Sequence, residues 1–235
     1  MIKNTGLATT FVHWPRLLAS LAGHIIFSIR FRVAKFIYNR ICFVVARAWQ
    51  EPLRASLAPR ANDRVLDFGA GSGSAAVTFA HRFPQATFIG ADPNPKAVKK
   101  ARHSIARRKL PNVEVISTPL HGRIPFDAGS FDQVVSVLAF HDRTPEQKLE
   151  ICTEMLRILR HGGTLHVTDF DRPATRSECR ILTYAERVSG RAAAEPHMNG
   201  SWTTVLKKAR FAGVRYRSYF SVGVGRVAIV KARKR

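Results

Sequence analysis

The stretch Val65-Leu66-Asp67-Phe68-Gly69-Ala70-Gly71-Ser72-Gly73 decides the fold of this 235-residue chain. It begins as a short, mostly apolar strand, and its three glycines let the backbone turn sharply and approach a ligand without clashes from Cβ atoms. A helical pattern follows to about Arg82, so the unpaired N–H groups and positive dipole end of a helix face the turn. The stretch predicts a strand, a ligand-binding loop and a helix.

The spacing of the glycines distinguishes this loop from two phosphate-binding loops. A dinucleotide-binding loop has the pattern G-x-G-x-x-G, whereas here the third glycine comes one residue earlier, and no G-K-[S/T] follows as in a P-loop. Asp67 precedes the loop, where it would repel pyrophosphate and attract the ammonium group of an amino acid. Asp92 follows about 20 residues later, at a strand end where a carboxylate can accept both ribose hydroxyls. Alone, Asp92-Pro93 could simply cap the next helix; together, these residues predict a nucleotide-type cofactor.

Strand-like and helical patterns alternate outward from this stretch, which predicts an α/β fold with a mainly parallel sheet and helices on both faces. From Pro52 to Asp63, two prolines and an Asn-Asp pair predict a linker or turn. We therefore expect an N-terminal cationic helical segment over residues 1–51 and one catalytic domain over residues 52–235. Strands are expected at residues 64–68, 86–91, 113–117, 131–138, 164–168, 214–220 and 226–230. Helices are expected from the glycine loop to about Arg82 and at residues 95–109, 145–160, 177–189 and 202–211.

Two further segments carry a resemblance. They are Ile124-Pro125-Phe126-Asp127 with Ser130-Phe131-Asp132, and Glu154-Met155-Leu156-Arg157-Ile158-Leu159-Arg160-His161-Gly162-Gly163. With the glycine loop, they make residues 64–235 resemble the class I S-adenosylmethionine-dependent methyltransferases. The similar subgroup includes the ubiquinone/menaquinone-biosynthesis C-methyltransferases and bacterial phospholipid N-methyltransferases.

The resemblance implies a Rossmann-like, seven-stranded sheet whose last strand is antiparallel, and S-adenosyl-L-methionine as the cofactor. It implies contacts to the methionine moiety from Asp67 and the loop, and to the ribose from Asp92. The residues expected to bind the cofactor are Asp67, Gly69, Ala70, Gly71, Ser72, Gly73, Asp92, Pro93, Thr118 and Leu138.

One departure from the family concerns adenine. Relatives usually have an acid after the third strand that hydrogen-bonds the adenine amino group, whereas this chain has Ser117-Thr118-Pro119-Leu120. The hydroxyl of Thr118 or a backbone carbonyl could substitute for it.

Methyl transfer from a sulfonium is an in-line displacement, so the protein must mainly align the acceptor and exclude water. A base is needed only where the attacking atom loses a proton. His141 is the candidate, because it follows the fourth strand, whose carboxyl end faces the ligand crevice of an open α/β sheet. It could equally line the pocket or cap the following helix.

Four residues are expected at the substrate. Phe140 precedes the candidate base, and the segment Glu195–Trp202 precedes the last helix, where relatives build a substrate lid. The candidates are Phe140, His197, Asn199 and Trp202, although an ordinary surface loop would give the same pattern. The three cysteines are widely spaced, which predicts neither a metal site nor a disulfide and fits a reducing compartment.

The charge of the chain points to a polyanionic neighbour. The net charge is +22, and residues 1–50 and 196–235 contain no acid. Arg32–Trp49 has the pattern of a helix that lies in a membrane interface, although a helix covering the pocket would look similar. We expect a cytoplasmic protein, peripherally bound to the inner, anionic membrane face, that methylates a lipid or quinone-like small substrate. The alternative functions are an RNA methyltransferase and a non-catalytic relic of the fold. The positive charge could also reflect a host whose proteins are generally basic.

Overall fold

The computed structural model describes residues 49–119 and 122–235 of the chain. The described residues belong to one compact unit. The expected membrane-binding segment therefore lies outside the described residues, apart from Trp49. The strands are β1 (Arg64–Phe68), β2 (Thr87–Asp92), β3 (Val113–Ser117), β4 (Phe131–Val137), β5 (Leu159–Asp171), β6 (Ala212–Ser221) and β7 (Arg226–Arg233). The helices are α2 (Gln50–Leu57), α3 (Ser74–Arg82), α4 (Pro95–Arg108), α5 (Pro145–Ile158), α6 (Cys179–Ser189), α7 (Arg191–Met198) and α8 (Thr204–Lys208), with a 3₁₀ turn η1 (Ser201–Thr203).

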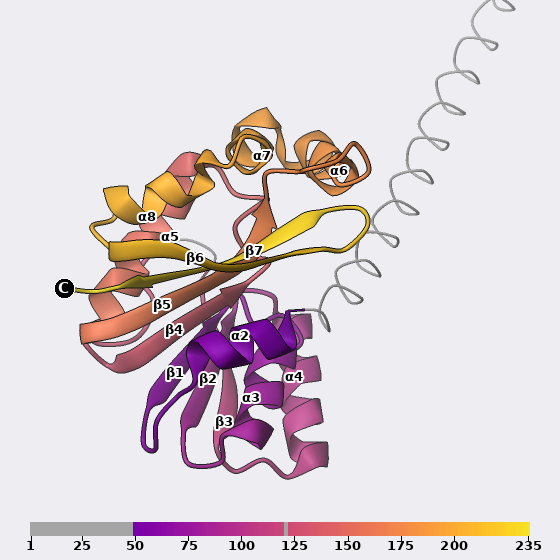
Figure 1. The fold of residues 1–235 in the computed structure, drawn as a ribbon. Helices are drawn as coiled ribbons and strands as arrows, with labels where there is room; N and C mark the ends of the chain where they lie inside the picture. The colour runs from indigo at the N-terminus through magenta and orange to yellow at the C-terminus, as the bar shows by residue number, and fades with distance from the viewer. Residues whose placement is uncertain (1–48, 120–121) are drawn as a thin grey trace, which may run out of the picture. The chain divides into compact units, whose positions relative to one another are not determined.

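The strands form one seven-stranded sheet in the order β3-β2-β1-β4-β5-β7-β6 (Figure 1). Strands β1 to β5 pair in parallel, and β7 pairs antiparallel with both β5 and β6. The strand order reverses between β1 and β4, which is where an open α/β sheet forms its ligand crevice. The expected Rossmann-like sheet with an antiparallel last strand is confirmed.

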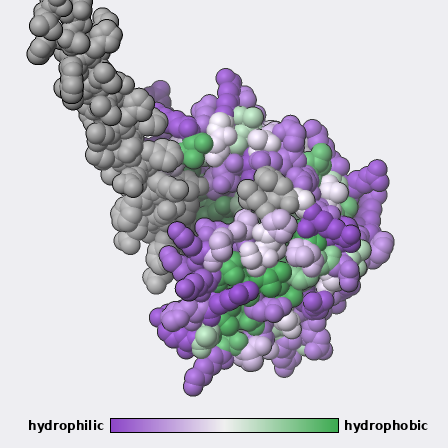
Figure 2. All heavy atoms as spheres, turned by 180° about the vertical axis from the view of Figure 1, so that it is seen from behind, coloured by the Kyte–Doolittle hydropathy of each residue, from purple (hydrophilic) through white to green (hydrophobic). Residues whose placement is uncertain are grey.

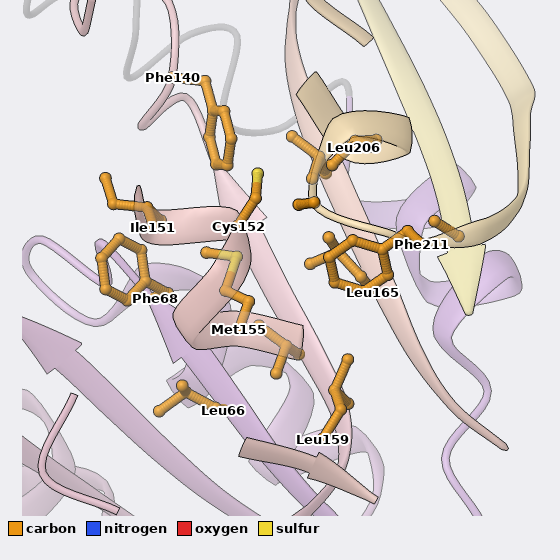
Figure 3. Packing of buried hydrophobic residues seen from close by; sticks show 14 of the residues in the cluster. Leu66, Phe68, Phe140, Ile151, Cys152, Met155, Leu159, Leu165, Leu206 and Phe211 are labelled. Carbon is orange, nitrogen blue, oxygen red and sulfur yellow. The ribbon is translucent and has the colours of Figure 1, made fainter. Parts of the chain in front are cut away.

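Helices cover both faces of the sheet. Helices α2, α3 and α4 lie on one face and α5 and α8 on the other, while α6 and α7 lie beyond the carboxyl end of β5 (Figure 1). In the core on the α5 side, Cys152 and Met155 of α5 face Leu66 and Phe68 of β1 (Figure 3). Four apolar residues of α5, which we call its apolar stripe, are buried: Ile151, Cys152, Met155 and Ile158.

Helix α2 takes up the first half of the expected linker, whereas residues 58–63 contain the expected turn. Pro52 is its third residue, and a proline is tolerated there because the first N–H groups of a helix have no intrahelical partner. The expected domain boundary between residues 51 and 52 thus falls inside a helix. Trp49, just before it, is buried against Phe79 of α3 with the two rings edge to face.

Strand β5 is longer than expected at both ends. The expected helix 145–160 ends at Ile158, and Leu159 already has an extended backbone. The strand start is held by an ion pair between Arg160 and Asp132. The N–H of Gly162 also donates to the carbonyl of Lys234, and the N–H of Lys234 donates to the carbonyl of Gly163. At the other end the strand runs on to Asp171, three residues past the expected end at Thr168. This extension brings two carboxylates into the crevice region.

The visible surface of the described part is mainly hydrophilic (Figure 2). In this view from behind, an apolar area lies between the hydrophilic residues (Figure 2). Across residues 49–119 and 122–235, the helices are too short or too polar to cross a bilayer.

Candidate active site

The glycine loop lies against the end of β4. Gly69 has φ +75°, and a Cβ atom there would lie 2.8 Å from the Cβ of Ala139, so a larger residue is excluded on both counts. Leu138 also has a positive φ of 54°, which is rare for a branched residue. Its N–H is held by the carbonyl of Thr168 at 2.8 Å. The strained backbone of Leu138 and the close approach of Gly69 to Ala139 therefore lie together, where the sequence predicts a cofactor.

Asp67 lies buried beneath this loop. Its Oδ2 accepts a 3.0 Å hydrogen bond from the N–H of Ala76, in the first turn of α3. Burial raises the pKa of Asp67 to about 7, the Ala76 N–H opposes the shift, and the charge of Asp92 adds to it. No Lys or Arg of the described chain forms an ion pair with it. A cationic ammonium group is the chemistry that would stabilise this carboxylate.

Asp92 is tied to the same loop from the end of β2. Its Oδ2 accepts the N–H of Gly71 at 2.7 Å, and its Oδ1 accepts the N–H of Asn94 at 2.8 Å. The alternative that Asp92 caps the next helix is wrong, since Asn94 is the N-cap of α4. A carboxylate oxygen can accept two hydrogen bonds, so both oxygens retain capacity for ribose hydroxyls.

Thr118 lies directly after β3, where the resemblance predicts the contact to adenine. Its hydroxyl is buried and, within the described residues, has no hydrogen-bond partner. A buried hydroxyl without a partner is costly, so a ligand that bonds to it gains what the protein alone lacks. Together with Asp67 and Asp92, this orphaned hydroxyl fits a cofactor built from an amino acid, a ribose and a base.

The remaining loop residues differ in exposure. Ala70 is buried, Gly71 and Pro93 are half-buried, and Ser72 is exposed. Their contacts to the cofactor stay predictions.

His141 forms a buried pair with Asp169. The His141 Nδ1 lies 2.8 Å from Oδ1 of Asp169, and the two side chains are 2% and 0% exposed. Burial acts to lower the pKa of His141, but the charge and hydrogen bond of Asp169 outweigh it, so the pKa is raised. Burial likewise acts against the ionised form of Asp169, yet His141 holds the pKa of that carboxyl at about 2. The pair is a histidine whose orientation and basicity are set by a carboxylate.

Backbone groups complete this pair. The N–H of Phe140 donates to Oδ2 of Asp169 at 2.7 Å, and the N–H of Phe170 donates to Oδ1 at 2.7 Å. The side chain of Phe140 is fully buried in the core, where it lies close to Cys152 (Figure 3). Its contact with a substrate stays a prediction, as does a chemical role for His141.

His197 and Trp202 come from the segment expected as a lid. The alternative of an ordinary surface loop is wrong, because His197 belongs to helix α7 and both side chains are at most 1% exposed. Their rings stack at 5.2 Å, and the indole N–H of Trp202 donates to Asp171 at 2.9 Å. Asn199 is exposed and accepts the N–H of Ser201, so it lies apart from this buried group.

The protonation of His197 follows from its contacts. Its Nδ1 donates to the carbonyl of Phe170 at 2.6 Å, and burial lowers its pKa to about 3. The ring is therefore neutral, and Nε2 is an acceptor that is buried without a partner in the described chain. The rings of His197 and His141 lie 6.4 Å apart.

Sequence reasoning missed three charged residues here. Asp169 and Asp171 lie in the unexpected extension of β5, and acids at the end of a strand were the available signal. Lys148 is 1% exposed on α5, four residues before Cys152 on the apolar stripe, and its Nζ donates to the carbonyl of Ala193 at 2.9 Å. Burial lowers the pKa of Lys148 to about 8, against the charges of Asp169 and Asp142.

Comparisons with known proteins agree with this geometry. Residues 65–163 match the family described as a methyltransferase domain. An uncharacterized methyltransferase of Synechocystis is 34% identical over 128 residues, which are 54% of this chain and 56% of that protein. The demethylmenaquinone methyltransferase of Deinococcus radiodurans is 30% identical over 58% of this chain and 56% of its own length. A ubiquinone/menaquinone biosynthesis C-methyltransferase of Pseudomonas putida is 33% identical over 50% of this chain and 45% of its own length. The chain thus spans about half the length of the curated relatives that it matches.

Solved structures share the fold. The YcgJ protein of Bacillus subtilis aligns with a TM-score of 0.60 at 16% identity, over 84% of this chain and 99% of that one. An S-adenosylmethionine-dependent methyltransferase of Aquifex aeolicus aligns with a TM-score of 0.58 at 18% identity, over 78% and 89%. The domain match over residues 65–163, the seven-stranded sheet and the glycine loop together make this chain similar to the class I S-adenosylmethionine-dependent methyltransferases.

Proposed function

We propose that this chain transfers a methyl group from S-adenosyl-L-methionine to a quinone-type ring at a membrane. The observation that carries the proposal is the buried pair of His141 and Asp169 at the carboxyl ends of β4 and β5, next to the glycine loop. A base is useful where the acceptor must lose a proton. Two matched relatives named for menaquinone or ubiquinone biosynthesis support a ring as that acceptor.

The bound cofactor would supply an electrophilic methyl group on a sulfonium. The acceptor atom forms a bond to the methyl carbon as the sulfur–carbon bond breaks, and that electron pair stays on sulfur. The imidazole of His141 accepts the proton that a ring hydroxyl or carbon loses, and Asp169 stabilises the resulting imidazolium. The buried surroundings exclude water, which strengthens this interaction.

A phospholipid headgroup amine is the second candidate acceptor. The Nε2 atom of His197 favours it, because an N–H donor would satisfy this buried acceptor. A ring hydroxyl could donate to the same atom, so the acceptor has to be identified by its product.

Docking at an anionic, cytoplasmic membrane face is part of the proposal. The net charge of +22 supports it, since basic residues near a bilayer are attracted to acidic headgroups. RNA would be attracted by the same charge, and the experiment therefore includes it.

The test is incubation of the full chain with cofactor labelled in its methyl group, with total membrane lipid and total RNA offered separately. We expect label in the quinone fraction after chromatography. Label in a phospholipid would favour the second candidate, whereas label confined to RNA would refute both. If the protein failed to bind S-adenosylhomocysteine in calorimetry, the fold would be a relic. The His141→Gln variant is the control for transfer without a base.

A further inference from the structure

A polar pocket opens at the amino ends of the strands, away from the glycine loop. It has a volume of about 450 Å³ and lies between the end of α2, the starts of β4 and β5, and strands β6 and β7. We call it the basal pocket and define it by Ser56, Arg60, Gln133, Arg160, Arg217 and Lys231. Because the cofactor loop and His141 lie at the carboxyl ends of the strands, the basal pocket plays no part in the proposed transfer.

Cations converge on one wall of the pocket. Lys231 of β7 lies directly opposite Arg215 of β6, and Arg217 occupies the position where the register of β6 shifts. Like charges directly opposite each other destabilise a sheet. Burial lowers the pKa of Lys231, and the charges of Arg217 and Arg215 lower it further. The sheet therefore holds three cations together at a cost to its stability.

No described carboxylate neutralises this wall. Among the residues that the structure describes, none of Arg215, Arg217 and Lys231 forms an ion pair. The Nζ of Lys231 donates to the carbonyl of Ser56, at 3.4 Å. This carbonyl lies at the C-terminal end of α2, where the helix dipole favours a cation. The ammonium group of Lys231 has three N–H donors and therefore keeps others for a ligand.

The acids of the pocket are already engaged on the opposite wall. Asp132 accepts the side chain of Arg160 and the N–H of Arg64. Asp63 accepts the N–H of Arg60 and the amide of Gln133, both at 2.9 Å. These carboxylates face other partners, so the charge of Arg217 and Lys231 is left for a ligand.

Two hydroxyls that line the pocket are bonded to a buried, neutral histidine. His166 lies 3.0 Å from the hydroxyl of Ser56 through Nδ1 and 3.1 Å from that of Thr164 through Nε2. Burial lowers the pKa of His166 to about 3, and the charges of Lys231 and Arg217 contribute. His166 is therefore uncharged and does not neutralise the cationic wall.

From this arrangement we infer that the basal pocket binds a phosphate group. A phosphate offers several acceptor oxygens and a negative charge, which match the fork of an arginine and the ammonium of a lysine. The group could belong to a lipid headgroup or to a soluble phosphate compound, and the two sources share this chemistry.

The first experiment titrates the full chain with inorganic phosphate and follows binding by calorimetry. Arg217→Glu is expected to weaken binding by about tenfold or more, because it reverses the charge at the wall. Lys100→Glu makes the same change of net charge at an exposed position of α4 and is expected to leave binding within about twofold. Arg217→Ala should give an intermediate loss, and unchanged affinity for S-adenosylhomocysteine shows that each variant is folded.

The second experiment separates the two sources. Flotation is compared on vesicles of phosphatidylcholine with and without phosphatidylglycerol. If Arg217→Glu reduces flotation on the anionic vesicles and Lys100→Glu does not, the pocket binds a lipid headgroup. If only phosphate binding falls, its ligand is a soluble phosphate compound. The inference is overturned if inorganic phosphate does not bind, or if both variants weaken its binding equally, which would show an effect of net charge alone.

Discussion

Two residues in the second half of strand β5, His166 and Asp169, each take part in a buried histidine contact, and the pKa values of the two histidines are shifted in opposite directions. His166 contacts the hydroxyls of Ser56 and Thr164, and burial and nearby cations lower its pKa to about 3. Asp169, nearer the end of the strand, pairs with His141, and the pKa of His141 is raised. Both rings are at most 2% exposed. Burial alone therefore does not decide protonation; the charge of the partner does.

The surroundings of the two residues also differ in how completely their polar groups are bonded. Around His166, hydrogen bonds form a continuous network from Ser56 to Asp63, whereas near the carboxyl ends of the strands Thr118 Oγ1 and His197 Nε2 have no partner in the described chain. Unpartnered buried groups lower stability and are expected where a ligand binds. The carboxyl edge therefore offers unpartnered neutral groups to a ligand, whereas the neutral groups beside the basal pocket bond to one another and leave its cations for a ligand.

Replacing His141 and His166 one at a time should give the largest effects, because the two histidines are expected to differ in their roles. We expect His141→Gln to slow methyl transfer by about 10²- to 10⁴-fold, because it removes a base while leaving the glycine loop intact. His166→Leu should leave the rate nearly unchanged but lower the free energy of unfolding by about 1–3 kcal/mol, because the buried hydroxyls of Ser56 and Thr164 lose their partner. Single-turnover rates and urea unfolding measure the two effects. Equal losses of rate would show that His141 is only structural.

Removing the charge of Asp169 tests the cause of the raised pKa. The rate of the wild-type protein should rise as pH increases through the pKa of His141, which lies above 6.5. Asp169→Asn should move this rise to lower pH and reduce the plateau by roughly 10–100-fold, as for other residues that orient a functional histidine. A pH–rate profile measures both.

The pKa shifts of the pair also make the stability of the fold depend on pH. The contribution from the raised pKa of His141 is fully present below the unfolded pKa of 6.5 and is lost as pH rises through the higher folded pKa. The contribution from the lowered pKa of Asp169 is lost as pH falls from 3.8 towards about 2. Asp169→Asn should abolish this part of the pH dependence of unfolding. A rate profile that keeps its position in the variant would contradict the assignment of Asp169.

Asp67 extends the comparison to the cofactor loop. Its pKa of about 7 means that the carboxyl keeps its proton at low pH, so the affinity for S-adenosylhomocysteine should rise by about tenfold as pH increases through that value. Asp67→Asn should bind with little change over the same range. Because the folded pKa is above the unfolded value of 3.8, the free energy of unfolding should also fall between these two pKa values. Calorimetry one unit below and one unit above the pKa tests the binding, and a flat wild-type curve would refute it.

Thr118 gives the smallest effect. Thr118→Val should weaken binding of S-adenosylhomocysteine by about 3- to 10-fold, because it removes one neutral hydrogen bond to the adenine. Stability should hold or rise slightly, since the hydroxyl that is removed has no partner in the described chain. Thr118→Ser keeps the hydroxyl and serves as the control. If Thr118→Val and Thr118→Ser bind S-adenosylhomocysteine with the same affinity, a backbone group holds the adenine.

Local patterns predicted most of the fold. The strand, three glycines and helix from Val65 onward, and the acid at Asp92, depend on backbone conformation and spacing within one β–α–β unit. The structure confirms the seven-stranded sheet that followed from them. Two predictions were wrong. Pro52 was expected in a linker but lies in the first turn of α2, and the fifth strand was expected to end before Asp169 but continues beyond its apolar run.

The sequence by itself determined the sheet, the loop with Asp67 and Asp92, and the position of His141 after the fourth strand. These features follow from neighbours in the chain. The pairing of His141 with Asp169, 28 residues away, is visible only in the tertiary structure. The same holds for the burial of His197 and Trp202, and for the pocket that Arg217 of β6 and Lys231 of β7 both line. Such pairs depend on strand register and helix packing, and the charge and protonation of each group depend in turn on its partner.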